Sequence, residues 1–147
     1  MPANVRVGFS PGANLYVPSG SWGTMSWDKQ YFGSAGTRNP SYPSRLYAPA
    51  TDIYYISAEV SFNPQSGGSK RVLSIVKNGS IVLALNMIPP QLALGQPADH
   101  IKLFTIEKLN GGDYVELLIL QDSGVNMYLI TGETVGNQIP TFSMASQ

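Results

Sequence analysis

The chain has 147 residues, which is enough for one domain with a single substantial core. Apolar residues make up 43% of the sequence and charged residues 12%, roughly half the usual charged share, and the formal net charge is zero. Nucleic acid is bound through clustered positive charge, so this balance gives no reason to expect such a partner. No stretch approaches the roughly 20 apolar residues of a membrane helix, and we expect neither membrane insertion nor a signal peptide.

The sequence contains no cysteine and a single histidine, His100. The absence of cysteine excludes disulfides, thiolate catalysis and cysteine metal sites. One histidine does not build a multi-histidine metal site within one chain. Three copies of His100 meeting on the axis of a trimer remain an alternative, and otherwise we expect no metal and no cofactor.

Fifteen glycines and eleven prolines divide the chain into short runs with a two-residue period, which is the pattern of strands and tight turns. Residues 5–9 alternate and end at a turn over residues 10–12. Residues 18–45 form a long stretch rich in Gly, Ser and aromatic residues, in which we expect one or two short strands. Residues 54–62 alternate between an apolar face and a mixed face that carries Tyr55.

The dipeptide Asn78-Gly79 predicts a two-residue hairpin turn, because it tolerates positive φ at both central positions. The expected register has these pairs: Val76 with Ile81, Ile75 with Val82, Ser74 with Leu83, and Leu73 with Ala84. Both faces of this hairpin are then apolar, and residues 114–120 share the property. Strands of this kind are buried on both faces. We interpret the second burial as contact with a partner subunit, and loops covering central strands are the alternative.

The remainder of the chain continues the strand pattern. Pro89 and Pro90 interrupt pairing, residues 101–106 resume it, and a turn over residues 109–113 leads into residues 114–120. Two further strands are expected at the end of the chain, over residues 126–131 and 141–145. Residues 1–147 are therefore predicted to form one all-β antiparallel domain, a sandwich or jelly roll of eight to ten strands.

The order of these pieces resembles the C1q/tumour-necrosis-factor-like jelly-roll superfamily. Residues 44–56 are similar to the family's stretch in which an aromatic residue, Ala-Pro and Gly-x-Tyr lead into a central strand. Residues 71–80 are similar to its strand ending in Lys-Asn-Gly, and residues 109–117 to its Leu-x-x-Gly-Asp-x-Val-x-Leu. The family's upstream aromatic-Asp pair and closing Phe-containing strand correspond to Trp27-Asp28 and residues 141–144. The chain departs from the family at Leu46, Asp52 and Ser143-Met144, where the family usually has Phe, Gly and x-Gly.

The resemblance implies a compact homotrimer whose inner sheets meet on the three-fold axis. By their positions, the candidates for the trimer interface are Tyr55, Tyr114 and Leu118. Bacteriophage capsid decoration proteins, head fibres and tail-fibre tips reuse this trimeric fold. We therefore expect a non-enzymatic structural or binding module of a virion, assembled in the host cytoplasm. Its expected partners are its own copies, other virion proteins and a host surface glycan.

Two other functions remain open. One is a C1q-like recognition domain of a bacterial surface or exosporium protein, which would be extracellular. The other is a small carbohydrate-active enzyme, which would need a carboxylate pair across a cleft.

The sequence offers little for catalysis, and we expect no catalytic residue. No Gly-x-Ser-x-Gly occurs that would present a serine to His100. Asp99 adjoins His100, but neighbours on a strand point to opposite faces. The run Gly67-Gly68-Ser69-Lys70 lacks the first glycine of a phosphate-binding loop and precedes no helix, so we interpret it as a strand connection.

Carboxylates and aromatic residues provide the remaining candidate sites. Asp99, Asp113 and Asp122 are possible calcium ligands, although Asp113 lies in a Gly-Gly-Asp turn where its side chain accepts backbone hydrogen bonds. The aromatic-rich stretch contains a candidate platform for stacking sugar rings, made of Trp22, Tyr31 and Tyr42. Trp27 and Phe32 are expected in the core instead, and core packing is the alternative for Trp22.

Overall fold

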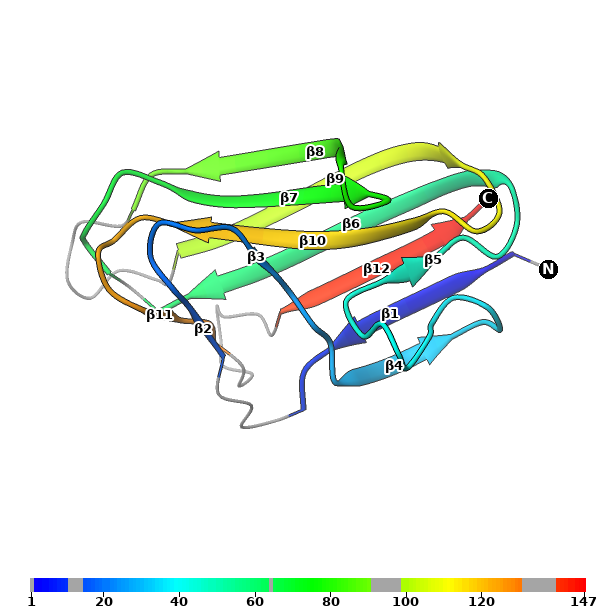
Figure 1. Cartoon of the computed structure of the whole chain (residues 1–147), viewed down its shortest axis with the longest axis horizontal. Helices are drawn as coiled ribbons and strands as arrows, with labels where there is room; N and C mark the ends of the chain where they lie inside the picture. Colours follow the sequence, from blue (N-terminus) through cyan, green and yellow to red (C-terminus); the bar gives the residue numbers. More distant parts are fainter. Residues whose placement is uncertain (1, 11–14, 64, 91–98, 131–139) are drawn as a thin grey trace.

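Figure 1 shows the computed structural model of the chain, which describes residues 2–10, 15–63, 65–90, 99–130 and 140–147. These residues form twelve strands and no helix. The strands are β1 (Asn4–Gly8), β2 (Tyr16–Val17), β3 (Gly23–Thr24), β4 (Lys29–Gly33), β5 (Leu46–Tyr47), β6 (Asp52–Phe62), β7 (Arg71–Lys77), β8 (Ile81–Ile88), β9 (Asp99–Leu109), β10 (Tyr114–Gln121), β11 (Met127–Tyr128) and β12 (Thr141–Ser146). The predicted all-β class is confirmed. The strand count exceeds the expected eight to ten because β2, β3, β5 and β11 have only two residues each.

The strands form two antiparallel sheets packed as a sandwich, which Figure 1 shows as two layers. The first, which we call the β6 sheet, has the order β4-β1-β12-β6-β9. The second, the β7 sheet, has the order β3-β10-β7-β8, with β5 also pairing to β10. The strands β2 and β11 form a separate two-stranded sheet, whose Val17 and Met127 belong to the same core. The stretch over residues 18–45 contains β3 and β4, as expected. The turn expected at residues 10–12 lies partly outside the described residues.

The core lies between the inner faces of the two sheets. On β10, Val115, Leu117 and Ile119 are buried while the residues between them are not, because successive side chains of a strand point to opposite faces. Trp27 is buried between the rings of Phe9 and Phe142, with ring centroids 4.9 and 5.8 Å away. Full burial of side chains of this size stabilises the fold by about 2 kcal/mol each. The prediction that Trp27 fills the core is confirmed.

Phe32 and Trp22 lie at the surface instead. The prediction of a core position for Phe32 is wrong, since half of this residue is exposed. The cause is its register on β4, which is the edge strand of the β6 sheet. Phe32 pairs there with Arg6, whose side chain points outward, and the register shifts between Arg6 and Val7. Trp22, for which core packing was the alternative, is also about half exposed.

The hairpin turn at Asn78-Gly79 is confirmed, but its predicted register is wrong. Both residues have positive φ, 51° and 79°, and the Ser80 N–H donates to the Lys77 carbonyl. The observed pairs are Lys77 with Ile81, Val76 with Val82, Ile75 with Ala84, Ser74 with Leu85, and Leu73 with Asn86. Three residues instead of two separate the paired Lys77 and Ile81, which moves the pairing by one residue, and the bulge between Ile75 and Val76 moves it by one more. The Asn78 N–H and side-chain oxygen are both bound to Tyr114 at the start of β10.

The apolar strand β7 is buried on both faces within the chain itself. Val72 and Val76 on its outer face are buried as well as Leu73 and Ile75 on its inner face. The neighbouring strands β10 and β8 flank these outer side chains. The side chains that remain uncovered are those of β8, which forms the edge of the β7 sheet.

Candidate functional site

Three of the exposed large apolar side chains on the outer face of the β6 sheet form a cluster. They are Tyr55 on β6 and Phe104 and Ile106 on β9, and Phe104 is 60% exposed. The register brings them together, because Tyr55 pairs with Ile106 and the neighbouring Ser57 pairs with Phe104. The rings of Tyr55 and Phe104 are stacked with their centroids 6.4 Å apart. We call this cluster the face patch.

Two adjoining hollows cross this face. One, of about 320 Å³, is lined by Tyr55 and Phe104 of the face patch together with Phe32 and Ala145. The other, of about 410 Å³, adds Glu59, Lys102 and Thr141. Both are lined by Arg6, Ser57, Phe104 and Ser143, so together they form one trough with an aromatic end and a charged end.

Glu59 at the charged end belongs to a set with Ser61 on the same strand and His100 on β9. The Ser61 hydroxyl lies 2.6 Å from His100 Nδ1, and His100 Nε2 lies 3.8 Å from the Glu59 carboxylate. Lys102 Nζ also lies 3.8 Å from that carboxylate. The order resembles a nucleophile, a base and an orienting acid, but Ser61 is completely buried and offers no hydroxyl to a substrate. Sequence reasoning considered Asp99 as the partner of His100 and missed this set, which depends on cross-strand register.

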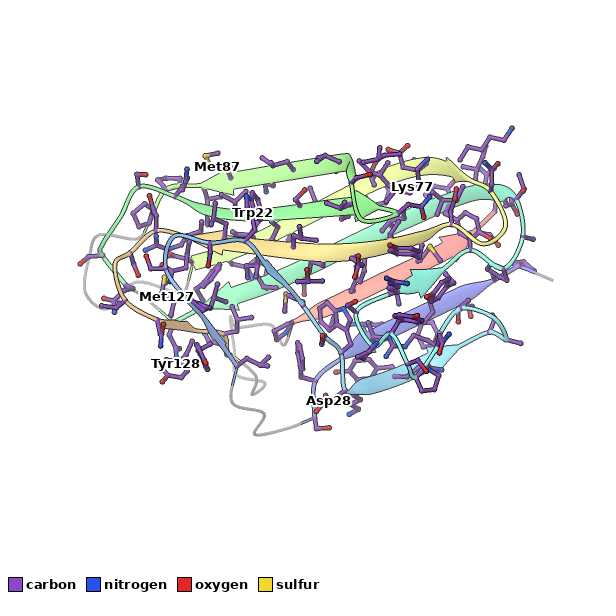
Figure 2. The ribbon with its side chains drawn as sticks, viewed as in Figure 1. Trp22, Asp28, Lys77, Met87, Met127 and Tyr128 are labelled. Carbon is purple, nitrogen blue, oxygen red and sulfur yellow. The ribbon has the colours of Figure 1, made fainter. Side chains whose placement is uncertain are left out.

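A second apolar surface lies along β8, which we call the β8 edge. It consists of the exposed side chains of Val82, Leu85 and Met87, which lie on one face of the strand, and Met87, labelled in Figure 2, is 55% exposed. Within the described residues β8 pairs only with β7, and no residue of β8 is charged. The Asn86 side chain donates to the Lys102 carbonyl at 2.8 Å, which ties β8 to β9 of the other sheet. An uncharged, apolar edge strand is open to association with another chain.

The three residues predicted at a trimer interface do not lie on one surface. Tyr55 is on the outer face of the β6 sheet, whereas Tyr114 and Leu118 are on β10, in the β7 sheet. The buried residues of β10 alternate with these two, so both point away from the core. Tyr114 packs against Tyr47, with ring centroids 5.7 Å apart.

The three residues predicted as a sugar platform are also separated. Tyr31 lies on β4 of the β6 sheet, with the guanidinium of Arg6 and the ammonium of Lys29 over its ring at 5.4 and 4.7 Å. Trp22 directly precedes β3, which pairs with the far half of β10 (Figure 2). Tyr42 belongs to the segment before β5 and contacts Arg45. The structure therefore does not assemble these three rings into one platform.

The carboxylates considered for calcium bind groups of the protein itself. The Asp122 carboxylate accepts hydrogen bonds from the Ser69 hydroxyl and from the N–H groups of Ser69 and Lys70, which lower its pKa to about 2. Asp113 is bound by the Asn78 amide and the Asn110 N–H, and both lower its pKa. Asp99 is buried against the Arg71 guanidinium at 3.2 Å. No group of three or more His, Asp or Glu residues in the described ranges could hold a metal ion.

The run Gly67-Gly68-Ser69-Lys70 lies between β6 and β7, in agreement with its interpretation as a strand connection. The buried Arg71 holds this connection by donating to the carbonyls of Gln65, Gly67 and Lys70. It also faces Asp99 and Asp122, the latter at 3.7 Å. This guanidinium therefore joins the connection to the start of β9 and the end of β10.

Comparison with known proteins does not assign the chain to a family. No protein-family model matches the sequence. No curated protein matches it either. The described residues contain no helix that is long and apolar enough to cross a membrane. The face patch and the β8 edge are the features of this structure that bear most directly on function.

Proposed function

We propose that this protein is a non-enzymatic jelly-roll module of a bacteriophage virion that assembles as a homotrimer. The observation that carries the proposal is the pair of uncovered apolar surfaces, the face patch and the β8 edge. Only 12% of the residues are charged, and six exposed apolar side chains are grouped on these two surfaces. Contiguous apolar surface of this kind marks contact with another protein.

The energetics favour covering both surfaces. Removing the exposed half of a side chain such as Phe104 or Met87 from water stabilises an assembly by about 1 kcal/mol. The face patch and the β8 edge together supply six such side chains. Their gain offsets part of the entropy that is lost on association.

The placement of the two surfaces supports a closed ring. The face patch lies on the outer face of the β6 sheet, and the side chains of the β8 edge lie on the outer face of the β7 sheet, at the side of the sandwich where β8 and β9 adjoin. Packing the β8 edge of one copy onto the face patch of the next is a head-to-tail contact, and such contacts generate rings when the rotation closes. The strand orders of the two sheets are compatible with the resemblance to the C1q/tumour-necrosis-factor-like jelly roll. That resemblance implies three subunits in the ring.

The proposed role in a virion rests on the phage proteins that share this type of fold. The resemblance extends to decoration proteins, head fibres and tail-fibre tips, and a cysteine-free, charge-poor, self-associating module suits such a part. Immunogold labelling of intact phage particles with antibodies to this chain tests this role. Labelling at a regular position on the particle is expected, and absence of the chain from purified particles would contradict the role.

The trimer is tested by placing a charge in each surface. Phe104→Asp and Met87→Asp should each reduce the mass in solution from that of a trimer to that of one chain, because an assembled interface would bury an unpaired carboxylate. Val125→Asp is the matched control, since Val125 is about half exposed in the connection between β10 and β11. Light scattering behind a sizing column reads the mass, and far-ultraviolet circular dichroism checks the fold. Equal masses for all three variants would contradict the proposed interface.

A further inference from the structure

A guanidinium held between two tyrosine rings lies at one end of the outer face of the β7 sheet. The Cζ atom of Arg45 is 4.1 Å from the ring centroid of Tyr42 and 4.0 Å from that of Tyr114. Arg45 also donates to the hydroxyl of Tyr47 at 3.3 Å. Tyr47 belongs to β5 and Tyr114 to β10, and these two strands pair directly. We call this cluster the tyrosine clamp.

Polar groups of both kinds border the tyrosine clamp. The Ser44 hydroxyl donates to Glu116 Oε2 at 2.5 Å, and Arg45 Nε lies 4.0 Å from the same oxygen. The side chains of Arg45 and Glu116 keep 26% and 14% of their surface exposed. Donor and acceptor groups therefore face solvent beside the rings, and the two charges compensate each other. This balance favours a neutral ligand over an anion or a cation.

The segment that carries Tyr42 is held in place although it is not a strand. The Arg38 guanidinium donates to the carbonyls of Trp27, Pro43 and Arg45 at 2.9–3.3 Å. The Tyr42 N–H donates to the Asn39 carbonyl within the same segment. One face of the Tyr42 ring is against Arg45, yet Tyr42 remains 46% exposed, so ring surface is available to a ligand. A rigid, exposed aromatic ring binds with little loss of conformational entropy.

We propose that the tyrosine clamp binds neutral hexopyranose units of a glycan. The apolar face of a sugar ring would stack on the exposed face of Tyr42, and its hydroxyls would bond to Arg45, Glu116 and Ser44. Ligand sites of this type combine aromatic surface with a few well-placed polar groups. The clamp lies on β5 and β10, and β7 separates β10 from the β8 edge. The clamp and the β8 edge therefore lie on the same outer face but share no residue.

Saturation-transfer NMR on the full chain tests the clamp, with methyl glycosides of glucose, galactose and mannose as probes. Transfer to at least one glycoside is expected at millimolar concentration. Tyr42→Ala should weaken binding of that glycoside about tenfold, and Glu116→Gln should weaken it measurably. Tyr16→Ala is the control, because Tyr16 is also about half exposed but lies on β2 against Tyr128.

Three results would overturn the proposal. They are an absence of transfer to all three glycosides, binding that Tyr42→Ala leaves unchanged, and binding that Tyr16→Ala weakens as much as Tyr42→Ala does. A proline decapeptide is included as a probe of a different class. Binding of that peptide at Tyr42 in place of the glycosides would also overturn the sugar assignment. Because Tyr42 is exposed, the amide NMR spectrum of Tyr42→Ala should retain the folded pattern, and the solution mass of the chain should stay unchanged.

Discussion

The Asp122 carboxylate shows how one residue makes stability depend on pH. Its pKa is lowered from 3.8 to about 2, first by the Ser69 hydroxyl and then by the N–H groups of Lys70 and Ser69. A carboxyl whose folded-state pKa is depressed contributes stability above its unfolded pKa and loses it as the pH falls through the folded value. The contribution of Asp122 is therefore complete above about pH 4 and is lost towards pH 2.

Replacing Asp122 tests this dependence. We expect the thermal midpoint of the native protein to fall between pH 4 and pH 2, and Asp122→Asn to reduce that fall. Ser69→Ala removes the largest cause of the shift and should reduce the fall in part. Calorimetric melts across this range provide the measurement. Identical pH profiles for the native protein and Asp122→Asn would show that the carboxylate has no such role.

Gly68 is required both by its backbone angle and by its surroundings. Its φ is +79°, and a Cβ atom there would lie in severe overlap with the Asp122 carbonyl and carboxylate. Gly112 has a similar φ of +93° but nothing within 4 Å of a Cβ. Gly112→Ala should therefore cost about 1 kcal/mol from the backbone alone, and Gly68→Ala a further 1–3 kcal/mol from overlap, at their urea midpoints. Equal losses in the two variants would contradict the close approach.

At the scale of elements, the hairpin turn between β7 and β8 is fastened to the turn between β9 and β10. The Asn78 amide donates to Asp113 at 2.9 Å, and the Tyr114 N–H donates to the Asn78 side-chain oxygen at 3.0 Å. Asn78 also has a positive φ, which asparagine tolerates better than most residues. One side chain thus joins the β7–β8 hairpin turn to the turn that connects the two sheets.

Two substitutions separate these roles of Asn78. Asn78→Gly keeps the backbone angle but removes the side-chain bonds, and it should lower the free energy of unfolding by about 1–2 kcal/mol. Asn78→Ala should cost about 1 kcal/mol more, because alanine disfavours positive φ. Both variants should raise the pKa of Asp113, since Asn78 is the largest cause of its lowering. Urea unfolding and NMR titration of the Asp113 carboxyl measure the two effects, and an unchanged Asp113 titration would contradict the link.

The sequence predicted the positions of the long strands better than the register between neighbouring strands. Alternation located β6, β9 and β10, because burial on one face leaves a two-residue period. The register of the β7–β8 hairpin was missed by one residue beside the turn and by two beyond the bulge at Ile75, since neither the third turn residue nor the bulge is visible in the apolar pattern. Phe32 was misplaced for a similar reason, because its outward direction depends on the β4–β1 register.

The candidate sites were also predicted only as far as local sequence patterns reach. Tyr55 was correctly singled out as an outward residue of a central strand, but its neighbours Phe104 and Ile106 become visible only through the β6–β9 register. Tyr42 was selected because it lies in the stretch rich in aromatic residues. The tyrosine clamp also needs Arg45 and Tyr114, and Tyr114 comes from a distant part of the chain. Long-range pairing therefore determines what sequence patterns alone do not.

At the scale of the whole molecule, the sandwich has a fully buried core but leaves two apolar surfaces exposed to solvent. The inner faces and both sides of β7 are covered within one chain, while the face patch and the β8 edge are not. The tyrosine clamp shares the outer face of the β7 sheet with the β8 edge, and β7 lies between them.

The mass of the unmodified chain in solution tests the central claim most directly. Light scattering behind a sizing column, over micromolar concentrations, should give about 47 kDa, three times the chain mass of 15.8 kDa. That result would support a homotrimer closed through the face patch and the β8 edge. A mass of 15.8 kDa at every concentration would contradict it, and both apolar surfaces would then need a different partner.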